Sequence, residues 1–368
     1  MLEHFLHLPN LLSLAQSMET SPCVSIDCTN NSCKALIISF VEKVIQKPIV
    51  IISKDTSSHD QLIENIPFFS KTTSLELPGL PESAEDSFFS NPEIIGERFK
   101  TLHQLYNSKK PFFIFTEIQA FKNPILSPQT LNEKCLQISK GQSIVFSLLT
   151  EKLFELGYNL KDLTTYPGEF SKRGGILDIY PLGNAMPVRL EFWDDEIESI
   201  RSFHPLSQRS EETLNSITIL PAKAASVIDS VNSTKNEFAH YLEKESLIIF
   251  NDIEIKDLPK ESQDSLSKFK SISFNQQQQD SWNSPFCSIQ NILSPFTTSE
   301  EKFSVLEYLE TLFQLPKKSY SLHFVTQTSQ DKILLQQRIK DFSTNSSPKA
   351  HIHQGYLSDS FCIKEENE

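Results

Sequence analysis

The sequence predicts an α/β fold in which an antiparallel α+β domain is inserted after a parallel-sheet domain. Over the first 125 residues, short apolar runs alternate with helical patterns, which is typical of a parallel sheet with helices on its faces. Near residue 128 the rhythm changes to closely spaced strands with turn residues between them. The chain has 368 residues, enough for two or three domains.

The first domain is predicted from strands and helices in alternation. Buried strands are expected at 24–28 and 48–54, with a helix over 34–46 between them. Two more strands are expected at 74–77 and 111–118. The helix over 91–110 starts with Asn91 as a cap and Pro92 at its first position, where the missing N–H of proline costs nothing.

The inserted domain is predicted to begin with a helix over 143–158. A series of hairpin strands follows, because apolar and polar residues alternate between turn signals. These strands are expected at 174–181, 187–193, 196–203 and 215–222.

The rest of the chain is more polar. A helix leading into a strand is expected over 238–250, a loop over the glutamine-rich 275–284, and a helix over 305–315. A new strand and helix follow at 321–327 and 331–342, with a last strand candidate in Phe-Cys-Ile-Lys near the end. We therefore divide the chain into 1–128, the inserted 129–222, a shortened 223–315, and 316–368 as the start of a further α/β domain that is cut short.

Composition excludes several classes of function. The formal charge of −13 argues against a broad basic surface for DNA. No apolar run approaches the length of a membrane helix, and the amino terminus does not resemble a signal peptide, so a cytoplasmic protein without membrane contact is expected. The spacing of Cys23, Cys28 and Cys33 does not match a zinc site. We expect no metal, no cofactor and no catalytic residue.

A phosphate loop would lie after the first strand, at residues 28–35. Such a loop needs glycines to turn its N–H groups toward phosphate, and the first glycine of the chain is Gly79. Asn30 and Asn31 stand where glycines would be needed, Lys34 remains, and Ala35 cannot hold Mg²⁺. The segment therefore predicts an inactive, degenerate phosphate loop. Taken alone, Lys34 is predicted to be an ordinary surface lysine at the start of a helix.

The most informative window is 167–209. Alternation in 187–193 places Arg189 and Trp193 together on the outer face of a strand, and Arg173 precedes the bend at Gly174 and Gly175. Arginine and tryptophan are enriched at binding hot spots, but an Arg–Trp stack that only covers the sheet explains the pattern equally well. The stretch 161–209 has six Lys and Arg against eight Asp and Glu, which favours a protein partner over DNA.

This window resembles the domain shared by the excision-repair subunit UvrB and the transcription-repair coupling factor. The resemblance rests on PGEF, RGGILDIYP, RLEFWDDEI, SIR, QRS and ITILPA, and extends upstream through SNPEIIGERFKTLHQL and LTEKLFELGY. UvrB has an intact phosphate loop and a tyrosine-rich DNA-gripping hairpin. This chain has a degenerate loop at 28–35 and no tyrosine between Leu77 and Asn91, so it resembles the coupling factor more closely.

The resemblance implies a module without ATPase activity that recruits UvrA during transcription-coupled repair. The UvrA-contacting positions of the family fall on Arg173, Arg189 and Trp193, around Gly174 and Gly175; Trp193 stands where phenylalanine is more usual. The family continues into domains that bind RNA polymerase and DNA, which this chain lacks, so a truncated or split form is expected. Two alternatives stay open: an ATP-dependent UvrB or helicase-type repair enzyme, and a remnant without a partner.

Overall fold

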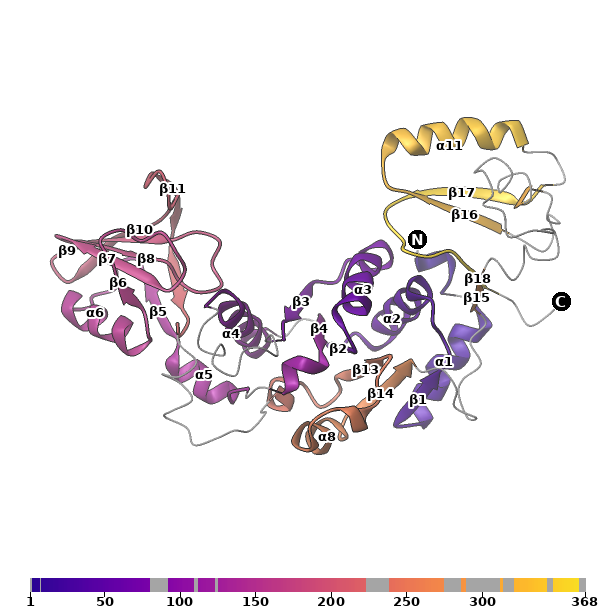
Figure 1. Cartoon of the computed structure of the whole chain (residues 1–368), viewed down its shortest axis with the longest axis horizontal. Coiled ribbons are helices and arrows are strands. Elements are labelled where there is room, and N and C mark those ends of the chain that lie inside the picture. Colours follow the sequence, from indigo (N-terminus) through magenta and orange to yellow (C-terminus); the bar gives the residue numbers. More distant parts are fainter. Residues whose placement is uncertain are drawn as a thin grey trace.

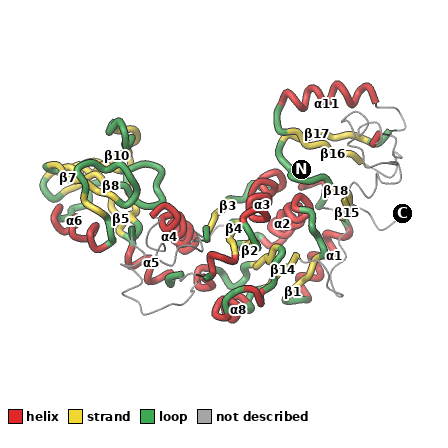
Figure 2. Tube along the Cα trace, in the orientation of Figure 1, coloured by secondary structure: helices red, strands yellow, loops and turns green. Residues whose placement is uncertain are grey.

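The computed structural model describes residues 2–6, 8–79, 92–108, 112–122, 125–222, 238–274, 286–288, 312–313, 321–342 and 347–363. A parallel sheet with helices on both faces occupies the middle of the molecule (Figure 1). The inserted domain lies at one end, and a small strand–helix–strand unit lies at the other (Figures 1 and 2).

The central sheet has six strands, and every pair of neighbours is parallel. Its middle strands are apolar on both faces, as expected for a sheet with helices on either side. In spatial order the strands are β1 (Cys23–Ile26), β14 (Lys270–Phe274), β13 (Leu247–Asn251), β2 (Ile49–Ser53), β4 (Phe113–Glu117) and β3 (Ser74–Leu77).

Two apolar cores sandwich this sheet. Ile49 and Ile51 face the core formed with α1 (Pro9–Thr20), α2 (Asn31–Ile45) and α3 (Thr56–Phe69). Val50 and Ile52 face the core formed with α4 (Pro92–Asn107), η4 (Phe238–Tyr241) and α8 (Lys260–Leu266). Short 3-10 turns are η1 (Leu2–His4), η3 (Ile118–Phe121) and η5 (Ile255–Asp257).

The chain returns to the first sheet after the insertion. Strand β13 lies between β2 and β14, and β14 lies between β13 and β1. The described part of 223–315 thus adds two strands to the sheet begun by residues 1–128. These two strands do not form a separate sheet. The helix expected over 238–250 is only the turn η4, and β13 follows it.

The inserted domain is built on a second six-stranded sheet, which is antiparallel apart from the short β6–β7 pair. Helices α5 (Pro128–Lys134) and α6 (Phe146–Glu155) precede it, and α6 is shorter than the helix expected over 143–158. The strand order is β11 (Ser210–Leu214), β10 (Glu196–Phe203), β9 (Val188–Trp193), β8 (Ile176–Ile179), β7 (Glu169–Arg173) and β6 (Asn159–Leu160).

The strand expected at 215–222 does not continue this hairpin series. It is β12 (Ser216–Ile219), which pairs antiparallel with β5 (Leu136–Ser139) in a separate two-stranded sheet. The chain passes from the first domain into the inserted domain at β5 and returns at β12. One apolar core extends across both domains. Helix α4 approaches the inserted domain so closely that a Cβ on Gly96 would lie 2.7 Å from the Gly183 nitrogen.

The last unit consists of β16 (Ser321–Thr326), α11 (Ser329–Phe342) and β17 (Lys349–Gln354), with the two strands parallel. Strand β18 (Phe361–Ile363) then pairs antiparallel with β15 (Phe286–Ser288). The loop expected at 275–284 and most of the helix expected at 305–315 lie outside the described residues. Within the described part, no helix is both long and apolar enough to cross a membrane.

Candidate functional site: the outer face of the inserted sheet

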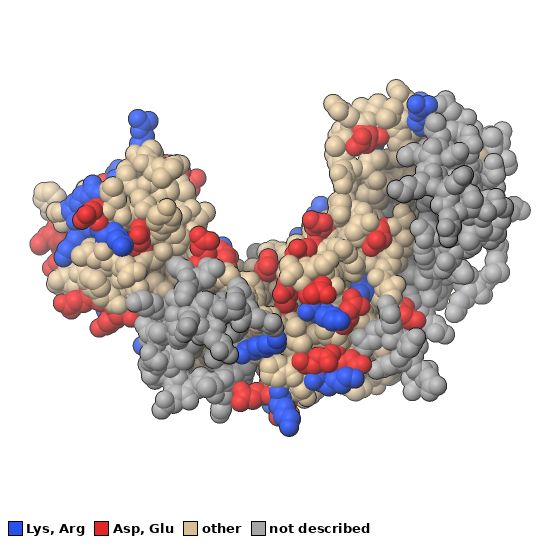
Figure 3. All heavy atoms as spheres, viewed as in Figure 1, with Lys and Arg blue, Asp and Glu red and all other residues tan. Residues whose placement is uncertain are grey.

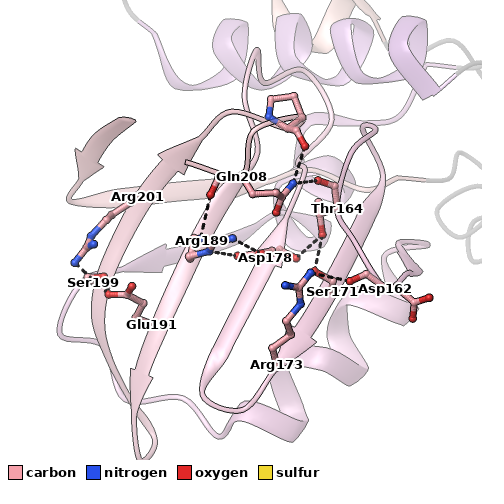
Figure 4. Close-up of polar contacts among 11 residues, drawn as sticks. Asp162, Thr164, Ser171, Arg173, Asp178, Arg189, Glu191, Ser199, Arg201 and Gln208 are labelled. Carbon is pink, nitrogen blue, oxygen red and sulfur yellow. Dashed lines mark hydrogen bonds and ion pairs between the residues drawn. The ribbon is translucent and has the colours of Figure 1, made fainter. Parts of the chain in front are cut away.

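The inserted sheet has one apolar face and one polar face. Leu177, Leu190 and Ile197 are fully buried on the inner face. On β9 the alternate residues Arg189, Glu191 and Trp193 therefore belong to the outer face, as the sequence pattern predicts. Figure 4 shows the polar side chains of this face and of the two loops that reach over it.

An ion pair lies at the centre of the outer face. Arg189 and Asp178 are directly opposite on β9 and β8. The Arg189 Nε donates to Asp178 Oδ1 at 2.7 Å, and its Nη2 donates to Oδ2 at 2.8 Å. The Asp178 side chain is only 4% exposed and that of Arg189 18%. This bidentate geometry gives the strongest type of side-chain pairing, and it neutralises a carboxylate that would otherwise be buried alone.

The surroundings of Arg189 fix its position further. Its guanidinium lies over the Phe203 ring, 4.7 Å from the ring centre, and Nη1 is 3.5 Å from the Gln208 carbonyl oxygen. Gln208 in turn donates from Nε2 to the carbonyl of Thr164, which joins the two loops over the face (Figure 4). The hydrogen bond to Asp178 raises the pKa of Arg189 above its ordinary value, so the group is always charged.

Arg189 lies on the predicted outer face, but it is not a free cation there. The alternation assigns the correct face, but the charge of Arg189 is already paired, and the side chain is largely covered by β8, Phe203 and the 204–209 loop. Asp178 is the residue that the sequence interpretation missed. An aspartate inside the apolar run Ile-Leu-Asp-Ile is the signal for it, because a buried carboxylate requires a cationic partner.

A second polar group lies one step along the same strands. Ser199 donates a hydrogen bond to Glu191 Oε2, and Arg201 Nη2 lies 3.2 Å from the same oxygen. Arg201 is more exposed than Arg189, with 43% of its side chain accessible. Both described arginines of β9 and β10 thus have a carboxylate within the domain.

Arg173 differs from these two arginines. It ends β7 at the edge of a two-residue hairpin, opposite Ile176, and its side chain is exposed. Its Nη2 donates a 3.0 Å hydrogen bond to the carbonyl of Asp162, which orients the side chain without neutralising its charge (Figure 4). Arg173 therefore presents a guanidinium group that can pair with a carboxylate from outside.

Gly174 and Gly175 form the hairpin next to Arg173. Gly174 has φ +56°, in the left-handed region that glycine adopts at the first central position of such turns. A Cβ on Gly175 would lie 3.0 Å from the Phe192 carbonyl oxygen, and the Gly175 carbonyl accepts a hydrogen bond from the Phe192 N–H. The glycine pair thus sets the hairpin against β9 and places Arg173 at this end of the sheet.

Trp193 is the most exposed aromatic side chain of the inserted domain among the described residues, at 77%. It precedes the tight turn Asp194–Asp195, in which Asp194 has φ +55°. The carbonyl of Asp195 accepts from the Ile144 N–H at 2.8 Å, so the hairpin tip is anchored to the segment before α6. A rigid backbone thus carries an indole that has little contact with its own chain.

The three predicted residues share one face but do not form one compact group. Four residues along a strand span about 13 Å, so Arg189 and Trp193 are not side by side as expected. Arg173 and Trp193 lie at the hairpin end of the sheet, while Arg189 lies further in, paired with Asp178. Of these three residues, Arg173 and Trp193 are thus exposed, and Arg189 supports the strands that carry them.

The second predicted site, at residues 28–35, has a different arrangement. Asn30 caps α2 by accepting from the Cys33 N–H at 2.9 Å. Lys34 is completely buried, and its Nζ lies 2.8 Å from both Asn251 Oδ1 and Asp252 Oδ2, beyond the end of β13. The interpretation of Lys34 as a surface lysine is therefore wrong. Sequence could not reveal its partners, which lie 217 and 218 residues away.

The described residues offer no other obvious centre of chemistry. No group of three or more His, Cys, Asp or Glu side chains is arranged among them to hold a metal ion. On the side of the molecule seen in Figure 3, Lys and Arg are interspersed with Asp and Glu and do not form a broad basic area on the described residues.

The inserted domain and its surroundings are also similar in sequence to known proteins. Residues 136–224, which include the whole antiparallel sheet, match the model of the UvrB interaction domain family. The transcription-repair-coupling factor of Haemophilus influenzae is 34% identical over 188 residues, which is 51% of this chain and 16% of that protein. Those of Bacillus subtilis and Staphylococcus epidermidis are 32% and 29% identical, over 53% and 67% of this chain.

The chain spans only 16% to 21% of the length of these relatives. Within that span, the relatives and the domain match point to the same module. The resemblance inferred from the sequence is thus confirmed: residues 136–224 match the UvrB interaction domain, and the chain is similar to the N-terminal, UvrB-like module of the transcription-repair coupling factor.

Proposed function

We propose that this chain is a non-catalytic module that recruits UvrA to sites of stalled transcription in nucleotide excision repair. The observation that carries the proposal is the match of residues 136–224 to the UvrB interaction domain, together with an exposed arginine and tryptophan on the outer face of that domain. The domain match makes UvrA the expected kind of partner. We further propose that contacts with RNA polymerase and DNA belong to parts of the full-length coupling factor that this chain does not span.

The chemistry of the face fits a protein partner that contributes carboxylates. Arg173 offers a planar guanidinium group for bidentate pairing, which lysine cannot reproduce. Trp193 offers a large apolar surface whose exposure is unfavourable until a partner covers it. The pairing of Glu191 with Arg201 leaves little net charge on β9 and β10, so the face is suited to a specific protein contact.

The proposed absence of ATPase activity rests on Lys34. A working phosphate loop directs its lysine at the nucleotide, whereas this Nζ is engaged by Asn251 and Asp252. The loop before α2 also has no glycine. These features favour an inactive, degenerate site over the alternative of an ATP-dependent repair enzyme.

We expect the purified chain to show neither ATP hydrolysis nor saturable ATP binding in the presence of Mg²⁺. Lys34→Ala should leave this result unchanged but should lower thermal stability, because it leaves Asn251 and the partly buried Asp252 without their cation. Calorimetric titration with ATP checks the first part and thermal unfolding the second. A micromolar dissociation constant for ATP would revive the enzyme alternative.

The inserted domain is also expected to compete with UvrB for UvrA, because the matched family is the domain that UvrB uses for interaction. In a binding assay between labelled UvrB and UvrA, addition of this chain should displace UvrB to completion. The displacement should not require ATP or DNA. If the chain leaves the UvrA–UvrB complex unaffected even in large molar excess over UvrA, the remnant alternative is favoured.

A further inference from the structure

The segment that follows β17 crosses back to the central sheet. Residues 355–361 leave the last strand–helix–strand unit, run past α3 and the start of α2, and end in β18 (Figure 1). The last residues of the segment reach the start of α2, which follows the carboxyl end of the outermost strand β1; helix N-termini at this end of such sheets usually receive phosphate-bearing ligands. This part of the molecule is far from the outer face of the inserted sheet, so a role for it goes beyond the proposed function (Figure 1).

A reciprocal pair of hydrogen bonds attaches this segment to α3. Asn65 is completely buried, and its Oδ1 accepts from the Ser358 N–H at 2.8 Å. The Asn65 Nδ2 donates back to Ser358 Oγ, also at 2.8 Å. A buried amide satisfied in this way would lose both partners if the segment moved away, which gives the contact its specificity.

The next two residues are attached to the start of α2. The Asp359 N–H donates to Ser32 Oγ at 3.0 Å, and Ser32 is itself completely buried. The Ser360 carbonyl accepts from Asn30 Nδ2 at 3.0 Å. Since Asn30 also caps α2 through its Oδ1, one side chain both ends the helix and holds the crossing segment. Asp359 brings an acidic residue to a helix N-terminus, where its charge is favourable.

Apolar packing holds the segment at either side of these hydrogen bonds. Leu357 and Phe361 pack against the core on the α2 face of the sheet. Before them, Gly355 lies so close to α3 that a Cβ at this position would be 2.2 Å from Cδ2 of the Phe68 ring. Only a residue without a side chain allows the backbone to pass here.

We propose that residues 355–361 act as a strap that covers the start of α2 and holds the β16–α11–β17 unit against the first domain. The strap occupies the start of α2 with its own N–H, C=O and acidic groups, so the chain itself covers this helix N-terminus. Four hydrogen bonds and a few apolar contacts make it a unit that opens locally at a small cost compared with unfolding of the sheet beneath it.

Hydrogen exchange on the whole chain tests the strap directly. In the wild-type protein the Ser358 and Asp359 amides should be protected. Asn65→Ala should raise the exchange rate of peptides covering 355–361 by at least about tenfold, because two hydrogen bonds are lost. Asn65→Asp would bury a carboxylate without a cationic partner at this position and should open the strap as well. Asp60→Ala, at an exposed position of the same helix, is the matched control and should change nothing.

A second variant tests the strap without altering the buried Asn65. Gly355→Ala should collide with Phe68 and open the strap, while peptides covering β2 and β13 keep their slow exchange. In a Phe68→Ala background, where the ring is absent, adding Gly355→Ala should have little further effect. Exchange of the Ser358 and Asp359 amides at unprotected rates in the wild type, or no response to Gly355→Ala, would overturn the proposal.

Discussion

Replacing Arg189 with alanine is expected to lower the free energy of unfolding of the inserted domain by about 3 kcal/mol, because the buried carboxyl group of Asp178 would lose its partner. The packing of the guanidinium group on Phe203 would be lost as well. UvrA binding should weaken in the same variant, since Arg189 supports the strands that carry Arg173 and Trp193. Thermal unfolding followed by circular dichroism measures the first effect and UvrA titration the second.

Three further variants separate the structural role of Arg189 from a direct contact. Arg189→Lys should restore little, because lysine cannot form the bidentate pair with Asp178. Asp178→Asn leaves the arginine in place and should also destabilise the domain. Arg201→Ala is the matched control: its pair with Glu191 is more exposed and should contribute less than about 1 kcal/mol. An Arg189→Ala protein that melts like the wild type but fails to bind UvrA would contradict the supporting role.

Replacing both Arg173 and Trp193 with alanine should weaken UvrA binding by at least about 100-fold while leaving the domain stable. Truncating a hot-spot residue typically costs about 2–4 kcal/mol of binding energy, or roughly 30- to 1,000-fold in affinity. Both side chains are exposed in the unbound chain, so the fold loses little with them. Arg173→Lys should recover only part of the affinity, because it restores the charge without the planar guanidinium group.

Lys172→Ala provides a close control for this double variant. Lys172 is also exposed, and replacing it with alanine removes the same charge one residue away. Alternation along β7, however, directs Lys172 to the opposite face of the sheet. Its UvrA affinity should therefore match that of the wild type. If Lys172→Ala weakens binding as much as Arg173→Ala, general charge attraction explains the interaction better than the proposed face.

Local patterns predicted most of the elements but not the order of the strands. The apolar runs at 48–54 and 111–118 predict strands, and both lie inside the central sheet as β2 and β4. The neighbours of β2 are β4 and β13, and β13 is contributed after the insertion, almost 200 residues later. Periodicity indicates that a strand is buried on both faces, but it carries no information on such distant pairing.

The same limit applies to the candidate site. Alternation assigned Arg189 and Trp193 to one face, but it could not distinguish a paired arginine from a free one. The Asp178 partner lies on the neighbouring strand, 11 residues earlier, and its pairing depends on the register of β8 with β9. The role of Lys34 was missed for the same reason, because the chain must fold before Asn251 and Asp252 reach it.

The most direct test of the UvrA proposal is a calorimetric titration of purified UvrA with the wild-type chain, without nucleotide or DNA, followed by the Arg173→Ala/Trp193→Ala chain. The account predicts saturable binding of the wild type and a loss of at least about 100-fold in affinity for the double variant, at unchanged melting temperature. No binding of the wild-type chain, or equal affinities for the two chains, would contradict the assignment of the outer face of the inserted sheet as the UvrA-binding surface.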